Sequence, residues 1–245
     1  MTVTSFEQIT DRSRRLWGGD AFFKLQNARV CVFGLGGVGS FAVSSLARGG
    51  VCNLMLVDGD SVDPSNINRQ AFAFTSTISK RKTDIAKHFV HEVSPKCNVE
   101  TFDTFITTDK FATVLEKVEE FRPDVVVDAI DSVSIKLLLA KTFAGQNDVL
   151  FVSSMGAANK TDATKITLSC LSKTMNDPLA RIIRKEARKQ HIPDYEVCYS
   201  SEKRTIAPDS QITRNSDKKI LGSTSFIPAI MGHMLAGYVM NYVAT

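Results

Sequence analysis

The chain has 245 residues, of which 43% are hydrophobic, which is enough to bury a substantial core, and we predict a single domain over residues 1–245. Its 30 basic and 26 acidic residues give a formal net charge of +4, which is too small by itself to predict nucleic-acid binding. The five cysteines form no CxxC pair, so neither a four-thiolate zinc site nor a disulfide framework is indicated. The N-terminus lacks a secretory or transit pattern, and the expected compartment is therefore cytoplasmic.

The first predicted element is an apolar, β-rich run at residues 29–33. It is followed by Gly-Leu-Gly-Gly-Val-Gly-Ser, by a helix over residues 41–49 and by a second apolar strand at 53–57. A strand, a glycine turn, a helix and another strand within about thirty residues are typical of the opening βαβ unit of a doubly wound sheet.

The same alternation continues along the chain. Further helices are expected near residues 82–93, 109–121 and 134–144, and further strands near residues 98–102, 125–129 and 149–153. This pattern predicts an α/β fold with a doubly wound, mostly parallel, Rossmann-like sheet and helices on both faces. From Ile166 onward it changes to a C-terminal extension with a basic helix, a polar loop over 203–219 and an apolar end.

The apolar end covers residues 221–245, which contain no Asp, Glu, Lys or Arg and are nearly long enough to span a bilayer. Several hydroxyl side chains, Pro228, His233 and three glycines make it a poor lipid-facing helix. We therefore expect a buried closing helix or a subunit interface, and no stable membrane association.

The glycine turn contains Gly34, Gly36, Gly37 and Gly39 between a strand and a helix. The absence of Cβ atoms lets backbone N–H groups approach phosphates, and the helix N-terminus favours negative charge. Asp58 ends the next strand, where an acidic side chain often binds a ribose. These features alone would favour a nicotinamide-dependent or flavin-dependent oxidoreductase.

The segment after the second strand favours a different chemistry. It reads Asp58-Gly-Asp60-Ser-Val-Asp-Pro-Ser-Asn66-Ile-Asn-Arg69-Gln70, and Lys82 follows twelve residues later. Nucleotidyl transfer places negative charge on the α-phosphate and the departing pyrophosphate, where Arg and Lys side chains stabilise the transition state. We therefore predict that Arg69 and Lys82 are catalytic, with exposed structural positions as the alternative.

This segment resembles the adenylation motif of the ubiquitin-activating-enzyme-like superfamily, whose members activate carboxylates with ATP. The resemblance implies that Asp58 holds the ribose hydroxyls and that Asn66, Arg69 and Lys82 contact the triphosphate. Asp60 is included in the same nucleotide-binding segment.

Two further sites follow from this resemblance. Asp131, in Asp128-Ala-Ile-Asp131-Ser, is similar to the magnesium-associated aspartate of the superfamily, so ATP and Mg²⁺ are the expected cofactors, with a helix N-cap as the alternative role. The segment Arg12-Ser-Arg-Arg15 resembles one that supplies an arginine across a dimer. It implies a homodimer in which Arg15, or failing that Arg12, is catalytic at the partner's ATP.

The C-terminal half distinguishes the branches of the superfamily. It lacks the paired CxxC motifs of zinc-binding members, and the stretches 173–180 and 198–202 resemble the tRNA threonylcarbamoyladenosine dehydratase family. This implies ATP-dependent dehydration (cyclisation) of threonylcarbamoyladenosine in the tRNA anticodon loop through an acyl-adenylate. The alternatives are adenylation of the C-terminus of a ubiquitin-like or sulfur-carrier protein with a sulfur-relay partner, or nucleotide sensing without chemistry.

Within this extension, residues 181–189 hold five cations and one acid, a pattern that attracts phosphates through counterion release. We expect residues 12–160 to bind the nucleotide and 161–245 to bind tRNA and form the dimer. Cys198 matches a family cysteine and has either a thiol role or that of a buried, inert thiol. The predicted tRNA-binding residues are Lys173, Arg181, Arg184, Lys185, Arg188 and Lys189.

Overall fold

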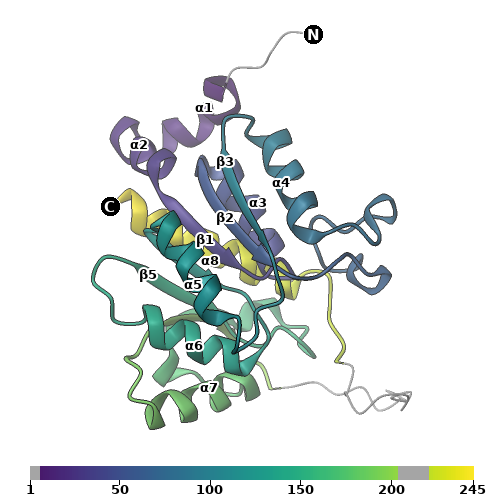
Figure 1. The fold of residues 1–245 in the computed structure, drawn as a ribbon, viewed down its shortest axis with the longest axis vertical. Helices are drawn as coiled ribbons and strands as arrows, with labels where there is room; N and C mark the ends of the chain where they lie inside the picture. Colours follow the sequence, from purple (N-terminus) through teal and green to yellow (C-terminus); the bar gives the residue numbers. More distant parts are fainter. Residues whose placement is uncertain (1–5, 204–220) are drawn as a thin grey trace.

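A twisted sheet runs through the middle of the molecule with the strand order β3-β2-β1-β4-β5-β7-β6 (Figure 1). The computed structural model describes residues 6–203 and 221–245. Every neighbouring pair of strands is parallel except β6 and β7, which are antiparallel. The strands are β1 (Arg29–Phe33), β2 (Asn53–Asp58), β3 (Asn98–Asp103), β4 (Val125–Asp128), β5 (Leu150–Ser154), β6 (Ile166–Cys170) and β7 (Glu196–Ser200).

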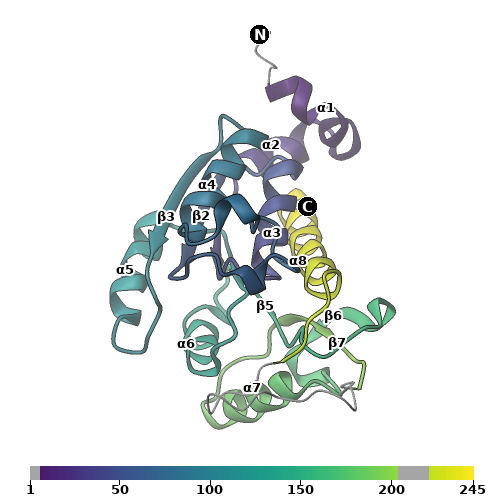
Figure 2. The same cartoon turned by 90° about the vertical axis from the view of Figure 1, so that its right-hand side faces the viewer.

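Helices cover both faces of this sheet (Figure 2). One face is covered by α3 (Gly39–Gly49), α4 (Lys82–Val93) and α8 (Ile227–Ala244), and the other by α5 (Phe111–Phe121), α6 (Val133–Phe143) and α7 (Pro178–Lys189). Alternate residues of β1 enter the two cores: Val30 and Val32 face α3, α4 and α8, whereas Cys31 and Phe33 face the other helices. This double coverage explains why the central strands are apolar throughout instead of alternating.

The N-terminal helices α1 (Phe6–Trp17) and α2 (Gly19–Asn27) form a smaller cluster at one end of the molecule. Phe6, Phe22 and Leu25 are its buried members. The ring of Phe22 packs against Gly50, which follows the last residue of α3. Because α3 begins at the glycine turn and has 11 residues, this cluster lies about 16 Å from the turn, on the length of an ideal helix.

The predicted doubly wound α/β fold is confirmed, and the predicted helices and strands lie within two residues of the observed ones. The expected pattern from Ile166 onward was incomplete, because β6 and β7 flank the basic helix. Both strands are short, and β6 is an edge strand with a single fully buried residue, so neither carries a strong periodic signal.

The apolar C-terminal segment is a closing helix, one of the two roles expected for it. Along α8, Met231, Leu235 and Val239 are fully buried against the sheet and α3. Within the described residues, no helix combines the length and apolar character needed to cross a membrane. The polar loop expected over residues 203–219 lies almost wholly outside the described part of the chain.

Candidate active site

The glycine turn lies where the strand order reverses between β1 and β4, the position at which doubly wound sheets open a crevice for ligands. Gly34 has a φ of 88°, and a Cβ atom there would lie 2.7 Å from the carbonyl oxygen of Ala129. A Cβ on Gly39 would lie 1.8 Å from the Gly34 carbonyl oxygen, so only glycine allows α3 to start this close to the turn. Gly36 is open to its surroundings. The turn can therefore present backbone N–H groups to phosphates.

Asp58 joins the end of β2 to this turn. Its Oδ2 accepts a hydrogen bond from the Leu35 amide at 2.6 Å, and its Oδ1 accepts one from the Asp60 amide at 2.7 Å. Burial raises the pKa of the Asp58 carboxyl, partly offset by the nearby charge of Lys82 and by these two hydrogen bonds. The structure thus fixes the Asp58 carboxylate beside the glycine turn. In doubly wound folds that bind dinucleotides, an acidic side chain at this position binds the ribose.

Lys82 is the first residue of α4, and its side chain is only 8% exposed. Its Nζ lies 2.8 Å from Asp60 Oδ2, while its backbone N–H donates to the Asp60 carbonyl oxygen. A buried ammonium group is retained in a fold when a partner compensates it, as Asp60 does here. The predicted residues Asp58, Asp60 and Lys82 therefore meet at the carboxyl edge of the sheet.

Arg69 and Asn66 lie on the chain that passes over the same turn. The carbonyl oxygen of Arg69 lies 3.5 Å from the position that a Cβ atom on Gly37 would occupy. The Arg69 guanidinium donates to the Ser65 carbonyl oxygen at 2.7 Å. Asn66 is buried, and its Oδ1 accepts from the Asp63 amide in a capping box. One half of the Asn66 amide is thus committed to closing the short 3-10 turn of residues 64–66.

Asp131 follows β4 and is exposed at the same edge. The alternative of an N-cap role is not what the structure shows, because Ser132 occupies the N-cap of α6. Among residues 6–203 and 221–245, no group of three or more His, Cys, Asp or Glu side chains could hold a metal ion. A metal ion at Asp131 would therefore need further oxygen ligands from water or a nucleotide.

A buried polar network supports the Asp131 loop, and it was missed from the sequence. The Lys136 ammonium donates to Asp128 Oδ2 at 2.9 Å, to Ser153 Oγ at 3.0 Å and to the Ser154 carbonyl oxygen at 2.7 Å, and both charged side chains are 0% exposed. Asp128 Oδ1 accepts from the Ile130 amide at 3.1 Å, which fixes the start of the loop. The available signal was Lys136, which stands among the apolar residues Ile135, Leu137, Leu138 and Leu139 of α6 (Val133–Phe143).

Comparison with known proteins identifies the family of this chain. A model of the ThiF family matches residues 10–245. The chain belongs to the ThiF family. It is 35% identical to tRNA threonylcarbamoyladenosine dehydratase of Bacillus subtilis over 91% of this chain and 89% of that protein, and 36% identical to the Haemophilus influenzae enzyme over 77% and 70%. It is also similar to a crystal structure of the Escherichia coli dehydratase in complex with ATP, with a TM-score of 0.84 and 27% identity over 99% of this chain and 97% of that chain.

In this ThiF-family chain, Arg15 lies away from the other predicted catalytic residues. It is on α1, which packs against α2 and α3, and its guanidinium pairs with Asp11 at 2.8 Å. The side chain of Arg15 is 78% exposed. As α1 belongs to the cluster at the far end of α3, the structure does not bring Arg15 to the glycine turn of its own chain.

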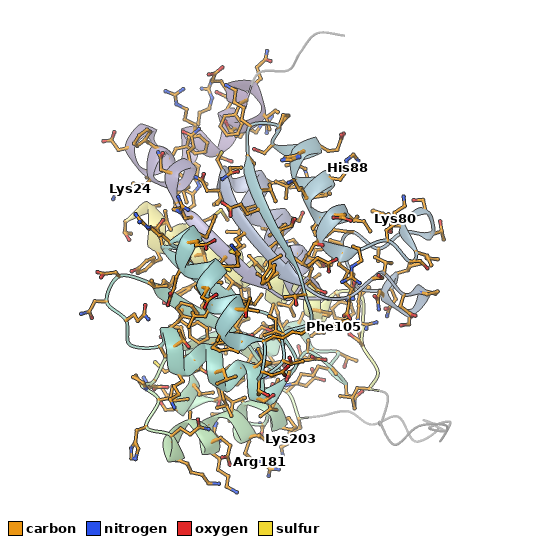
Figure 3. All side chains as sticks on the ribbon, in the orientation of Figure 1. Lys24, Lys80, His88, Phe105, Arg181 and Lys203 are labelled. Carbon is orange, nitrogen blue, oxygen red and sulfur yellow. The ribbon has the colours of Figure 1, made fainter. Side chains whose placement is uncertain are left out.

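The basic helix α7 lies at the opposite end of the molecule from α1 in both views (Figures 1 and 2). Arg181, labelled in Figure 3, is exposed, and so are Lys185 and Arg188. Arg184 is half-buried, and its Nη1 donates to the Thr174 carbonyl oxygen at 2.8 Å and to Thr174 Oγ1. One nitrogen of the Arg184 guanidinium is thus engaged within the chain, and a contact of Arg184 with tRNA stays a prediction.

The other two residues of the predicted tRNA-binding set are exposed. Lys189 lies at the end of α7 and pairs with Glu186 at 2.9 Å, while Lys173 precedes the helix. Surface pairs of this kind are weak, so Lys189 can exchange Glu186 for a phosphate at little cost.

Cys198 is fully buried in β7, and burial raises the pKa of its thiol to about 12. A thiolate is the reactive form of cysteine, so a thiol role for Cys198 does not fit this environment. The inert, buried thiol is the alternative that the structure supports.

Proposed function

We propose that this chain is an ATP-dependent tRNA threonylcarbamoyladenosine dehydratase. The observation that carries the proposal is the gathering of the glycine turn, Asp58, Lys82 and Arg69 at one edge of the sheet, in a chain 35% identical to such a dehydratase over 91% of its length. The matched relatives are named as dehydratases of threonylcarbamoyladenosine, whose threonine part carries a carboxylate that ATP can activate.

The reaction proceeds in two displacements. A carboxylate oxygen of threonylcarbamoyladenosine attacks the α-phosphorus of ATP, and the bond to the bridging oxygen of pyrophosphate breaks. A nucleophile of the same modified nucleoside then attacks the activated carbonyl carbon, loses its proton and expels AMP, which closes a ring. The net change in the nucleoside is the loss of one water. Its oxygen is the carboxylate oxygen that leaves in AMP, one hydrogen is the proton lost by the nucleophile, and the other was lost when the carboxylic acid ionised.

The residues of this chain position the reactants and stabilise charge. Amides of the glycine turn bind phosphate oxygens, and Asp58 accepts hydrogen bonds from the ribose hydroxyls. Arg69 and Lys82 carry positive charge to the α-phosphate and the departing pyrophosphate, where the transition state is most negative. The pairing of Lys82 with Asp60 holds the ammonium at the edge before ATP arrives.

Mg²⁺ fits this site as a partner of the nucleotide. Asp131 would hold the ion together with phosphate oxygens, since carboxylate oxygens are preferred ligands of Mg²⁺. Bound there, the ion would neutralise charge on the phosphates. The Asp128–Lys136 pair keeps the loop in place for this purpose.

The active enzyme is a homodimer in this proposal, with Arg15 serving the ATP bound by the other copy. Arg15 is exposed and remote from the site of its own chain, as an arginine acting across an interface must be. Leu16, next to Arg15 on α1, and Phe23 on α2 are 80% and 66% exposed, and two large apolar side chains exposed on the N-terminal helices support burial against a second copy. A sulfur-relay partner finds no support among the described residues.

The tRNA binds along α7 through Arg181, Lys185, Arg188, Lys189 and Lys173. These cations are exposed on one end of the molecule, and the phosphate backbone of RNA is their natural partner.

The test is mass spectrometry of nucleosides from tRNA incubated with the protein, ATP and Mg²⁺. Threonylcarbamoyladenosine is expected to lose one water only when ATP is present. Unchanged tRNA, combined with ATP-dependent adenylation of the C-terminus of a small protein, would overturn the proposal in favour of carrier-protein activation.

A further inference from the structure

The loop of residues 173–177 presents one large apolar side chain to solvent from a tightly held backbone. Met175 is 59% exposed, whereas Thr174 and Asp177 on either side are 6% and 3% exposed. A single exposed methionine is ordinary on a mobile surface loop. Here the neighbouring residues are anchored in several directions, so the position of Met175 is fixed by the fold.

Arg184 provides the first anchor. Its guanidinium donates to both the carbonyl oxygen and the hydroxyl of Thr174, and that hydroxyl also donates to the Leu171 carbonyl oxygen at 2.8 Å. Asn176 has a φ of 59°, a backbone conformation that asparagine tolerates better than most residues. Its Nδ2 donates to the Ser201 carbonyl oxygen at 2.9 Å.

Asp177 ties the loop to the carboxyl edge of the sheet. Its Oδ2 accepts from the Gly156 amide, just beyond β5, at 3.1 Å and from the buried Lys160 ammonium at 3.4 Å. Its Oδ1 caps α7 through the Ala180 amide at 2.9 Å. Since β5 is two strands from β1, Gly156 lies on the same edge as the glycine turn, about 10 Å away at the usual strand spacing.

We propose that this loop is the docking site for a nucleobase of the RNA substrate, with Met175 as the contacting side chain and Arg184 as a positioning residue. The inference rests on the proposed function and names a subsite for it. In threonylcarbamoyladenosine only a few bonds separate the adenine base from the reacting carboxylate. This base must therefore dock close to the carboxyl edge of the sheet, where the proposed function places the phosphates of ATP.

The surroundings of Met175 favour a nucleobase over an apolar protein segment. Lys173 is exposed two residues away, and the exposed cations Arg181 and Lys185 follow on α7. Single-stranded RNA binds where cations contact the backbone and neighbouring side chains pack against its unstacked bases. Methionine is suited to this contact because its thioether packs favourably on aromatic rings.

The test compares tRNA affinity across a salt series for a set of matched variants. Met175→Ala is expected to weaken tRNA binding by about 2- to 12-fold, the range for loss of one contact between a thioether and an aromatic ring, with an unchanged log–log salt slope. Met175→Phe should restore or strengthen binding, because a phenyl ring also stacks. Ile182→Ala is the control: it removes another exposed apolar side chain, on α7 and 44% exposed, and should bind as wild type does.

Contacts with phosphates and contacts with a nucleobase differ in how they change the salt dependence of tRNA binding. Lys185→Ala should lower the slope by about 0.7 to 0.9, as one phosphate contact is lost. Arg184→Gln should weaken binding as Met175→Ala does while leaving the slope and the KM for ATP unchanged. A slope lowered in Arg184→Gln would show that this arginine contacts phosphate after all.

Wild-type tRNA affinity in Met175→Ala would overturn the inference. The comparison of Met175→Ala with Ile182→Ala decides this even if Arg184→Gln fails to fold. If Met175→Ala binds tRNA normally while the wild-type protein dehydrates tRNA, the docking site is wrong and the proposed function survives. If the wild-type protein neither binds nor dehydrates tRNA, both fall.

Discussion

Replacing Lys136 by methionine should destabilise the fold and slow adenylation together. The change leaves the Asp128 carboxylate fully buried without its cation, which lies 2.9 Å away in the native protein. Removing one partner of a buried ion pair costs about 3 to 5 kcal/mol. Ser153 Oγ at 2.7 Å and the Ile130 amide at 3.1 Å still donate to Asp128, so we expect the lower end, about 3 kcal/mol.

Equilibrium unfolding in urea measures this loss. With a slope of about 2 to 3 kcal/mol per molar urea, the midpoint should fall by about 1 to 1.5 M. Turnover should fall as well, because Lys136 fixes the orientation of the Asp128 carboxylate, and that carboxylate positions the Ile130 amide at the start of the Asp131 loop. Adding Asp128→Asn should recover part of the stability, since it removes the uncompensated charge.

The matched control is Lys117→Met, which breaks an exposed pair with Glu120 at 2.6 Å. Its urea midpoint should not change measurably, because exposed pairs contribute little. If Lys136→Met shifts the midpoint no further than Lys117→Met does, the buried network does not hold the site in the way described.

Three further predictions concern the site and its symmetry. Arg69→Ala should lower turnover by about two orders of magnitude or more, the scale for a lost transition-state partner, with an unchanged melting temperature; equal losses of both would indicate a structural role. Mixing Arg15→Ala protein with Asp131→Ala protein should restore activity through heterodimers, and no recovery despite heterodimers seen by native mass spectrometry would contradict a shared site. Cys198 should stay unmodified by iodoacetamide in the folded protein at pH 8, because its raised pKa keeps it as a thiol, and Cys198→Ala should retain adenylation; rapid labelling, or loss of activity in a folded variant, would restore the thiol role.

The sheet core, and the places of the glycine turn, Asp58 and Lys82 at its carboxyl edge, could be predicted from the sequence alone. Apolar runs alternating with amphipathic ones need coverage on both faces, and that requirement leaves a doubly wound sheet as the solution. Gly34, Asp58 and Lys82 were predictable because their chemistry depends on position relative to strand ends, and a short stretch of chain fixes that position.

Which basic side chains are exposed to a partner, and which carboxylates are buried, depends on the tertiary structure. Arg184 and Lys185 are neighbours in a basic run, yet one bonds to Thr174 and the other faces solvent, because the helix rotates successive side chains about 100° apart. The pairing of Asp128 with Lys136 and the burial of Cys198 depend on strands and helices packing from different parts of the chain. The anchoring of Met175 has the same origin, since the groups that hold its loop come from residues up to 26 positions away, and composition records none of those distances.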